Sequence, residues 1–241
     1  MPAPLKTEAI VLRSIRYGEA DRILHLYTPH HGRISAIAKG VRRARSRFGA
    51  RLEPFFHVRT MLHEGRGDLH TVTSVDTVAT HSALRDHATT LDSAARACDA
   101  VARLFETADP HPEVFVLLAN QLALLCADPA RAAPQTGLAF RLKLLLAAGI
   151  LPHLGACAGC GESEHLQGFS AAAGGVVCGS CEAAAFSLDE DAYGFLVTAV
   201  GRPLAQAPAA SDRALRQAER AIIETAEHHG HVRLRPLLNG R

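Results

Sequence analysis

The sequence lacks the motifs by which common classes of enzyme are recognised. It contains no P-loop, no nucleophile elbow, no HExxH segment and no Rossmann glycine fingerprint. Its 14 histidines form no convincing ligand group. The one acidic cluster, residues 189–191, falls in a first helical turn, where acids are expected for local reasons. We therefore expect a protein that is not an enzyme.

The sequence also lacks a long apolar run. The longest, residues 144–151, is too short to cross a bilayer. No export signal is visible, because Lys6, Glu8 and Arg13 appear before any apolar core develops. With 48% hydrophobic and 21% charged residues, the composition is that of a soluble globular protein, and 241 residues suit two modest domains. We expect a cytoplasmic protein with no membrane contact.

Cysteines are few, but four of the six form two Cys-x-x-Cys pairs, Cys157 with Cys160 and Cys178 with Cys181. The 17 residues between the pairs are the spacing of zinc knuckles, and four thiolates complete the tetrahedral coordination of one ion. A disulfide framework and a redox motif are the alternatives, and neither fits paired motifs in a chain without an export signal. We predict one structural Zn²⁺ with no open coordination position.

The net charge of +2 hides an uneven distribution. Residues 1–80 hold 13 lysines and arginines against 7 acids, whereas the remaining residues hold 13 against 17. A basic N-terminal part, followed by a mildly acidic remainder, indicates a module that binds polyanions and is joined to a second part with another role.

The basic part is predicted to form a small β-barrel. Segments with the alternation or composition of strands are residues 5–15, 22–28, 33–38, 55–63 and 69–75. Five short strands within about 75 residues match a closed barrel of the OB type. The first strand is not cleanly one-sided, and its expected common face consists of Thr7, Ala9, Val11, Arg13 and Ile15.

An irregular basic segment, residues 39–49, separates the third and fourth predicted strands. Residues 39–47 contain five positive side chains and no acid. A solvated loop is the plain interpretation, but OB folds bind single strands across one face and its loops. The predicted nucleic-acid contacts are Arg33, Lys39, Arg42, Arg43, Arg45, Arg47 and Arg51. The aromatic residues that flank the segment are stacking candidates, although core packing is expected for most: Tyr27, Phe48, Phe55 and Phe56.

From residue 81 onward, apolar residues recur at the spacing of three and four residues that is typical of α-helices. One stripe predicts a single long helix that ends near residues 109–110: Leu84, Ala88, Leu91, Ala95, Cys98, Ala102 and Phe105. A second helix is expected from Pro112 and a third over residues 134–148. Ser187 and Glu190 form a capping box for a fourth, and Ser211 caps a fifth.

The predicted fold is therefore a multi-domain α+β protein. A five-stranded OB-type barrel occupies residues 1–80, and a helical domain follows over residues 81–153. A zinc module with four cysteine ligands, residues 154–186, is inserted before residues 187–241, whose helices pack back on the helical domain.

Short segments along nearly the whole chain resemble the RecO family, the bacterial recombination mediators of the RecFOR pathway. In the basic part they are residues 17–22 (YGEADR), 27–33 (YTPHHGR), 39–43 (KGVRR) with 46–47 (SR), and 52–55 (LEPF). Before the first cysteine pair they are residues 140–141 (FR) and 144–145 (LL), then Gly149, Pro152 and Leu154. Each is modest alone, but their order and spacing together are specific.

The resemblance implies a DNA repair and recombination protein with an OB domain, a helical bundle and a zinc module. It implies binding of single- and double-stranded DNA, annealing of complementary strands and a complex with RecR. That complex helps load RecA onto strands coated by single-strand-binding protein (SSB). A place in the cytoplasm at the nucleoid follows. Some family members lack the zinc cysteines, which makes the metal architectural.

In the RecO family the acidic tail of SSB docks on the helical domain. The residues that match are Phe140, Arg141 and Leu144, where a cation beside an apolar surface suits an acidic peptide with a hydrophobic end. Lys143 matches less closely. Two other functions stay open, a zinc and OB protein that acts on RNA and a DNA-processing enzyme with an unrecognised active site. Annealing without ATP or divalent metal separates the mediator from both.

Overall fold

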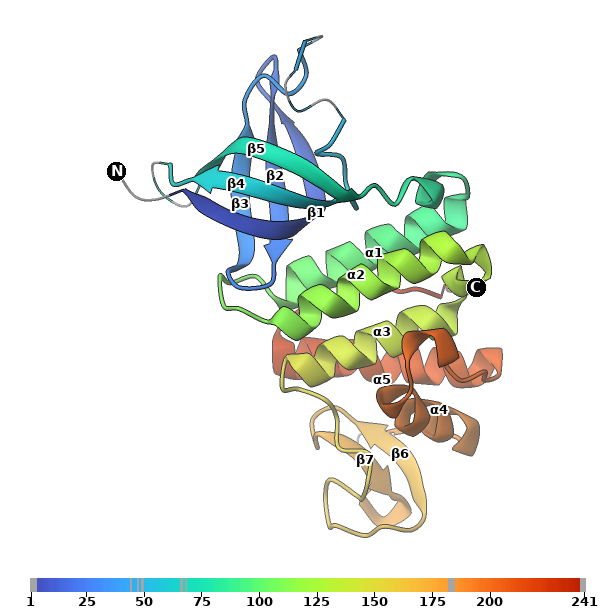
Figure 1. Ribbon diagram of the computed structural model, residues 1–241. Helices are drawn as coiled ribbons and strands as arrows, with labels where there is room; N and C mark the ends of the chain where they lie inside the picture. The colour runs from blue at the N-terminus through green and yellow to red at the C-terminus, as the bar shows by residue number, and fades with distance from the viewer. Residues whose placement is uncertain are drawn as a thin grey trace. The chain divides into compact units, whose positions relative to one another are not determined.

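The computed structural model describes residues 4–43, 45–46, 48, 50–65, 67, 69–181 and 185–238 (Figure 1). The chain forms two compact units, Met1–Pro129 and Ala130–Arg241. The predicted division into four parts is finer and stays a prediction. Within the described ranges, no helix combines the length and the apolar character that a membrane span requires.

The first unit begins with a closed five-stranded barrel, as predicted. Its strands are β1 Leu5–Tyr17, β2 Asp21–Thr28, β3 Gly32–Ala38, β4 His57–His63 and β5 Leu69–Ala79. They follow the order β1-β2-β3-β5-β4, and β4 pairs again with β1. The β3–β5 pair is parallel and the other pairs are antiparallel.

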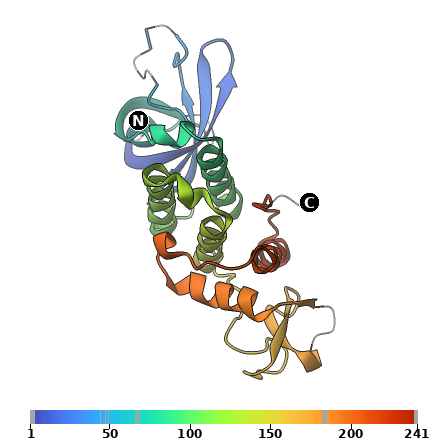
Figure 2. The ribbon, with the colours of Figure 1, turned by 90° about the vertical axis from the view of Figure 1, so that its right-hand side faces the viewer.

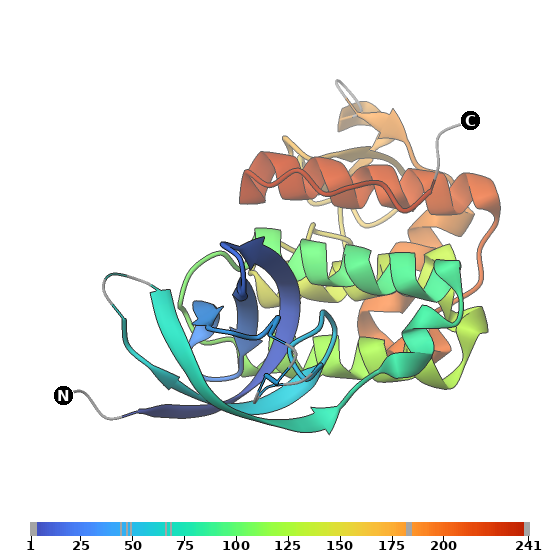
Figure 3. The ribbon, with the colours of Figure 1, turned by 90° about the horizontal axis from the view of Figure 1, so that it is seen from above.

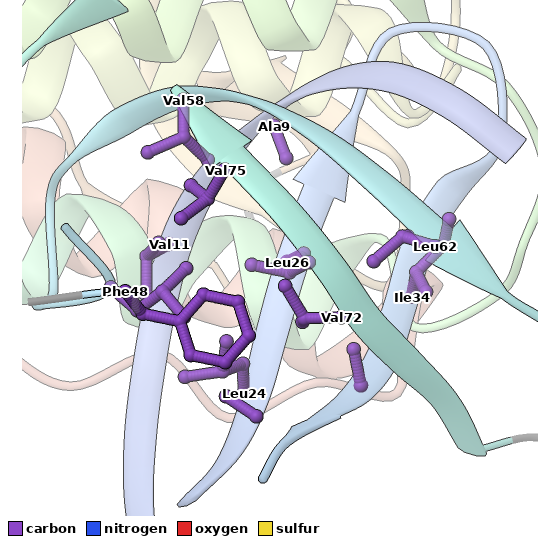
Figure 4. Packing of buried hydrophobic residues seen from close by; sticks show 13 residues of the cluster. Ala9, Val11, Leu24, Leu26, Ile34, Phe48, Val58, Leu62, Val72 and Val75 are labelled. Atoms are coloured by element: carbon purple, nitrogen blue, oxygen red, sulfur yellow. The ribbon is translucent and has the colours of Figure 1, made fainter. Parts of the chain in front are cut away.

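Alternating apolar side chains fill the barrel (Figure 4). Leu24 and Leu26 point inward from β2, and Val72 does so from β5. Phe48, from the long segment between β3 and β4, is buried among them. Each fully buried side chain of this size contributes about 1.5–3 kcal/mol, so Phe48 anchors the segment between β3 and β4 to the barrel core.

A β-bulge in β1 reverses the faces of that strand. Val11 pairs with Leu26, but Arg13 pairs with His25, so β1 has one extra residue. Val11 therefore points into the core, whereas Arg13 and Ile15 point outward with His25. The predicted common face of Val11, Arg13 and Ile15 was wrong for this reason.

Two helices complete the first unit, α1 Ala88–Leu104 and α2 Pro112–Ala127, preceded by a short turn, η1 Ser82–Arg85. The α2 prediction from Pro112 is confirmed. A long helix before residues 109–110 is confirmed as α1, but its expected start near Leu84 and its expected apolar stripe were wrong, because the chain breaks before α1 and the buried face changes phase. Leu91 is exposed, and the buried face of α1 consists of Thr90, Ala94, Ala97, Cys98, Ala100 and Val101.

The second unit holds three helices and a small sheet (Figure 2). The helices are α3 Pro134–Ala147, α4 Glu190–Gly201 and α5 Asp212–Gly230, with short turns η2 Pro129–Ala132 and η4 Leu204–Gln206. The sheet has the order β7-β6-β8, from β6 Leu166–Ser170, β7 Gly175–Cys178 and β8 Phe186–Ser187, and η3 Gly179–Cys181 follows β7. The α+β fold class is confirmed.

The N-terminal caps of α4 and α5 show one correction. Ser211 caps α5 as predicted, because its side chain accepts a hydrogen bond from the Ala214 N–H at 3.2 Å. The capping box at Ser187 was wrong. Asp189 caps α4 instead and accepts from the Ala192 N–H at 2.9 Å, while Ser187 belongs to β8.

Candidate metal centre and nucleic-acid interface

The four predicted metal ligands come together at the edge of the small sheet. The Sγ atoms of Cys157, Cys160, Cys178 and Cys181 all lie within 4.8 Å of one another. Tetrahedral coordination at a Zn–S distance of about 2.3 Å places sulfurs roughly 3.8 Å apart. The Sγ atoms of Cys160 and Cys178 are 3.7 Å apart. The donor set therefore fits a tetrahedral metal ion, and among the residues that the structure describes it is the only such cluster.

Glycines give the first cysteine turn its shape. The turn closes through hydrogen bonds from the Cys157 N–H to the Glu162 carbonyl at 2.7 Å and from the Gly161 N–H to the Cys157 carbonyl at 2.8 Å. Gly161 has a φ of 82°, which favours glycine. A Cβ on Gly159 would lie 3.2 Å from the Cys181 Sγ, so a side chain there would crowd the sulfurs.

The electrostatics of the four sulfurs call for a cation. The pKa of Cys157 is lowered to about 6, chiefly because the Cys178 N–H donates to its Sγ at 3.3 Å. The pKa of Cys181 is raised to about 12, chiefly by its hydrogen bond with Cys160. Sulfurs this close cannot all ionise against one another unless a positive charge sits among them. A divalent metal ion bound by the four thiolates would supply that charge.

Side chains of α4 and α5 attach the cysteine module within the second unit. The Tyr193 hydroxyl donates to the Leu154 carbonyl at 2.8 Å, just before the first cysteine pair. His229 Nε2 lies 2.8 Å from the Ala171 carbonyl, at the turn between β6 and β7. The Arg220 guanidinium lies 4.1 Å from the centre of the Phe186 ring. A metal ion bound by the cysteines would therefore stabilise a module that already contacts α4 and α5 at several points.

The predicted nucleic-acid contacts are mostly exposed side chains of one segment. Lys39, Arg42, Arg43, Arg45 and Arg51 are all exposed. Arg47 lies outside the described residues. These exposed cations make a surface to which a polyanion can bind, and whether they bind one stays a prediction.

Arg33 differs from the other predicted contacts because it is half-buried. Its Nη1 donates to the Ala102 carbonyl at 3.4 Å. It also lines a pocket of about 760 Å³, whose other charged and titratable lining residues are His31, Glu64, His70 and Glu106. The carboxylates of Glu64 and Glu106 would repel a phosphate in this pocket. The surface around Arg33 therefore differs from the exposed basic segment.

The backbone holds the beginning of the basic segment against the turn between β1 and β2. The Gly40 N–H donates to Asp21 Oδ1 at 2.7 Å. The Arg42 N–H donates to the Ala20 carbonyl at 2.9 Å, and its Nη1 donates to the Glu19 carbonyl at 3.0 Å. The beginning of the segment is therefore fixed to the barrel, while the side chains of Lys39, Arg42, Arg43 and Arg45 stay exposed.

Most of the aromatic residues proposed as stacking candidates pack in the interior. Tyr27, Phe48 and Phe55 are buried, and Tyr27 meets the Phe105 ring edge-to-face at 6.3 Å. Phe56 is half-buried and packs against the barrel core. For the three buried residues the core interpretation is the correct one, so their rings are not open to a base.

Sequence reasoning missed the cations of β1. Arg13 and Arg16 are exposed, and neither was among the predicted contacts. The bulge in β1 turns Arg13 to the outer surface beside His25. The uneven alternation of residues 5–15 was the one sign of this arrangement in the sequence.

The predicted partner-binding residues lie inside the second unit. The exposed fractions of Phe140, Arg141 and Leu144 are 1%, 2% and 0%. Arg141 lies with its Nη1 3.9 Å from the Glu219 Oε1 on α5, and its Nη2 donates to the Arg235 carbonyl. No groove open to solvent exposes these three side chains, and their contact with a partner stays a prediction.

The described residues after α5 cover Arg141. After α5 the chain doubles back along this helix (Figure 3). The Glu219 carboxylate accepts from the N–H groups of Leu237 and Leu238, and Leu234 is buried. The ion pair of Arg141 and Glu219 therefore fastens the returning segment to α3 and α5.

Lys143 and Arg141 are both on α3, but their side chains make different contacts. Its Nζ donates to the Val200 carbonyl at 2.7 Å, in the last turn of α4. A cation there satisfies a free carbonyl and opposes the negative end of the helix dipole. Burial lowers the pKa of Lys143.

Replacing Arg141 with methionine is expected to destabilise the chain by about 3–5 kcal/mol, because the buried Glu219 carboxylate would lose its cation. Urea unfolding measures this loss. The matched control is Arg213→Met, since Arg213 is exposed and 3.4 Å from Asp189, and surface pairs contribute about 0–1 kcal/mol. Adding Glu219→Gln to Arg141→Met should recover part of the loss. Equal stabilities of the two single variants would contradict the structural role of Arg141.

Comparison with protein families gives matches over almost the whole chain. Residues 1–81 match the model described as "Recombination protein O N terminal". Residues 86–237 match the one described as "Recombination protein O C terminal".

Curated proteins give similarity over the same length. The chain is 38% identical to "DNA repair protein RecO" of Anaeromyxobacter dehalogenans (strain 2CP-C), over 93% of this chain and 91% of the relative. It is 39% identical to the protein of that name from Rubrobacter xylanophilus, over 90% of this chain and 88% of the relative. A relative of that name from Bifidobacterium longum (strain NCC 2705) is 39% identical over 72% of each chain.

Proposed function

The chain belongs to the RecO family of DNA repair proteins, and we propose that it acts as a recombination mediator. In this proposal it binds single- and double-stranded DNA and anneals complementary strands. With RecR, it helps load RecA onto single strands coated by SSB. It works in the cytoplasm at the nucleoid, and it is not an enzyme. The resemblance found in the sequence is confirmed at the level of the family.

One observation carries the DNA-binding part of the proposal. Five exposed cations lie in and just beyond a single segment that is fixed by backbone hydrogen bonds to an OB-type barrel: Lys39, Arg42, Arg43, Arg45 and Arg51. Phosphate contacts dominate the affinity of proteins for nucleic acids and need no particular base sequence. Such a surface suits a protein that must act on any strand.

Fluorescence anisotropy with labelled single- and double-stranded oligonucleotides tests this binding at a stated salt concentration. We expect both to bind, with affinity that falls as salt rises. A chain that binds neither at low salt would contradict the proposal. Co-purification with RecR tests the second partner, and loss of the complex in a pull-down from purified components would remove RecR from the account.

The cysteine cluster supports a single structural Zn²⁺ per chain. Its donors are four sulfurs at distances that fit tetrahedral coordination, with no further His, Asp or Glu in the described cluster. Four protein ligands leave no position for substrate, so the ion would hold the module together and supply no catalysis.

We also place the docking of the acidic SSB tail on the second unit, near Phe140, Arg141 and Leu144. The resemblance to the family supports this part. Because the returning segment covers Arg141, direct contact with its guanidinium requires that segment to move. A fluorescence titration with the tail peptide tests the docking, and Lys143→Met is preferable to an Arg141 variant because Arg141 is part of the buried ion pair.

Affinity for single strands is expected to rise as the pH falls, because of His25. Burial lowers the pKa of His25, and the Arg33 and Arg13 charges beside it lower the pKa further. The Ser35 Oγ, a further polar atom beside this ring, lies 3.4 Å from the His25 Nδ1. A phosphate near the exposed Arg13 would offset the repulsion from that charge and raise the pKa of His25 in the complex. Binding would then take up a proton, so lower pH favours binding.

Dissociation constants at pH 8 and pH 6, at fixed ionic strength, measure this linkage. We expect the strand to bind a few-fold more tightly at pH 6, since each unit of pKa shift is worth at most about ten-fold. In the variant His25→Gln the difference should shrink. An identical pH dependence in both proteins would exclude His25 as its source.

A further inference from the structure

The outer surface of β1, β2 and β3 carries a row of isoleucines. Ile15 on β1 pairs with Ile23 on β2, which pairs with Ile37 on β3. The neighbouring residues Leu24 and Ala36 point into the barrel core, so the alternation of a strand places the isoleucines on the outside. Ile15 is 37% exposed. Ile23 is half-buried and Ile37 is only 8% exposed, so the part of the row that is open to solvent is its Ile15 end.

Tyr17 extends this row. It lies two residues beyond Ile15 on β1 and therefore on the same face, and it is 53% exposed. The chain has three tyrosines, nine phenylalanines and no tryptophan, all within the described ranges, and only Tyr17 is more than half exposed. A tyrosine ring is a surface on which any nucleobase can stack. The four other aromatic candidates are buried or half-buried, namely Tyr27, Phe48, Phe55 and Phe56.

Cations border the same face. Arg13 lies two residues from Ile15 on β1, and its charge acts on His25 together with that of Arg33. Lys39 directly follows β3. The acid that faces Tyr17 is Asp21, whose Oδ1 accepts a hydrogen bond from the Gly40 N–H. The exposed Tyr17 ring beside Ile15, with flanking positive charge, is complementary to a single strand, whose bases are apolar on their faces and whose backbone is anionic.

We propose that the outer face of β1–β3 binds single-stranded DNA, with a base stacked on Tyr17 beside the isoleucine row and phosphates on the flanking cations. This inference rests on the proposed function and assigns a site within it. In a duplex the base faces are already stacked on one another. Contact with Tyr17 therefore favours single strands over duplex and holds the bases on an open surface of the barrel.

The test compares wild-type protein and Tyr17→Ala on two probes of equal length, oligo-dT and a strand of abasic sites. Stacking on one aromatic residue is worth about ten-fold in affinity, so the variant should bind oligo-dT on the order of ten-fold more weakly. It should bind the abasic strand and a duplex as the wild type does. The salt dependence on oligo-dT should stay unchanged, because Tyr17 holds no phosphate. Val78→Ala, which alters an exposed side chain on β5, is the matched control.

The variant Tyr17→Trp gives a direct report, since the chain has no other tryptophan. Oligo-dT should change its emission at saturation, and the abasic strand should leave the emission unchanged. If wild-type protein binds oligo-dT but Tyr17→Ala binds both strands as tightly, the stacking site is wrong while DNA binding stands. If Tyr17→Ala weakens binding to oligo-dT and to the abasic strand equally, the stacking site is also wrong. Failure of the wild-type protein to bind any strand would instead remove the proposed function.

Discussion

Cys157→Ser is expected to abolish stoichiometric zinc binding and to unfold the module of residues 154–186. Three thiolates cannot close the tetrahedron, and the binding free energy of a structural zinc is in effect folding free energy. Apparent binding free energies of about 10–16 kcal/mol in small zinc domains leave room for a local loss of several kcal/mol here. Elemental analysis and thermal denaturation measure the two effects.

The matched control is Cys126→Ser, which removes a half-buried thiol outside the cluster. This variant should keep one zinc per chain. Binding of DNA should change little in Cys157→Ser, because the basic segment belongs to the other unit. Absence of zinc from wild-type protein purified without chelator would contradict the metal assignment. Unchanged thermal stability of Cys157→Ser would contradict its structural role.

Changing Arg42, Arg43 and Arg45 together to alanine is expected to weaken binding to all single strands alike. If about four phosphates are neutralised by the wild type, the logarithm of affinity falls against the logarithm of salt with a slope of about −3. That slope means a loss on the order of fifty-fold between roughly 50 and 200 mM salt. Removing three contacts should flatten the slope by about 2, with no change in base preference.

The control for this variant is the triple change of Arg213, Arg216 and Arg233 to alanine. These exposed arginines of α5 and the segment after it alter the net charge equally but lie in the second unit. Circular dichroism should be normal for both proteins. An unchanged slope in the Arg42, Arg43 and Arg45 variant would move the DNA off this segment, and the solvated-loop interpretation would then hold.

Local patterns predicted most elements because local physics determines them. The alternation of residues 22–28 predicts β2, whose Leu24 and Leu26 fill the barrel. The spacing of the cysteine pairs predicts the cluster, because each Cys-x-x-Cys turn already brings two sulfurs together. In these cases the information lies within a few residues of the feature.

The errors arise where contacts with residues far away in the sequence determine the local structure. The Val11 N–H and carbonyl pair with Phe56 and Phe55, which are far away in sequence, and next to this contact the bulge turns Arg13 outward. The burial of Arg141 could not be predicted either, because it faces Glu219 on α5, while its contact with a partner stays a prediction. Neither partner can be identified from neighbouring residues. The same bulge places Arg13 on the face that carries Tyr17.

Strand annealing tests the central claim most directly, namely that this chain is a DNA-binding mediator and not an enzyme. Complementary oligonucleotides, bare or coated with SSB, are mixed with the protein in the absence of ATP and divalent metal, and duplex formation is followed by fluorescence. The account predicts that wild-type protein accelerates annealing and that the Arg42, Arg43 and Arg45 variant does so much less. Annealing at the uncatalysed rate, or only when ATP or a divalent metal is added, would contradict it.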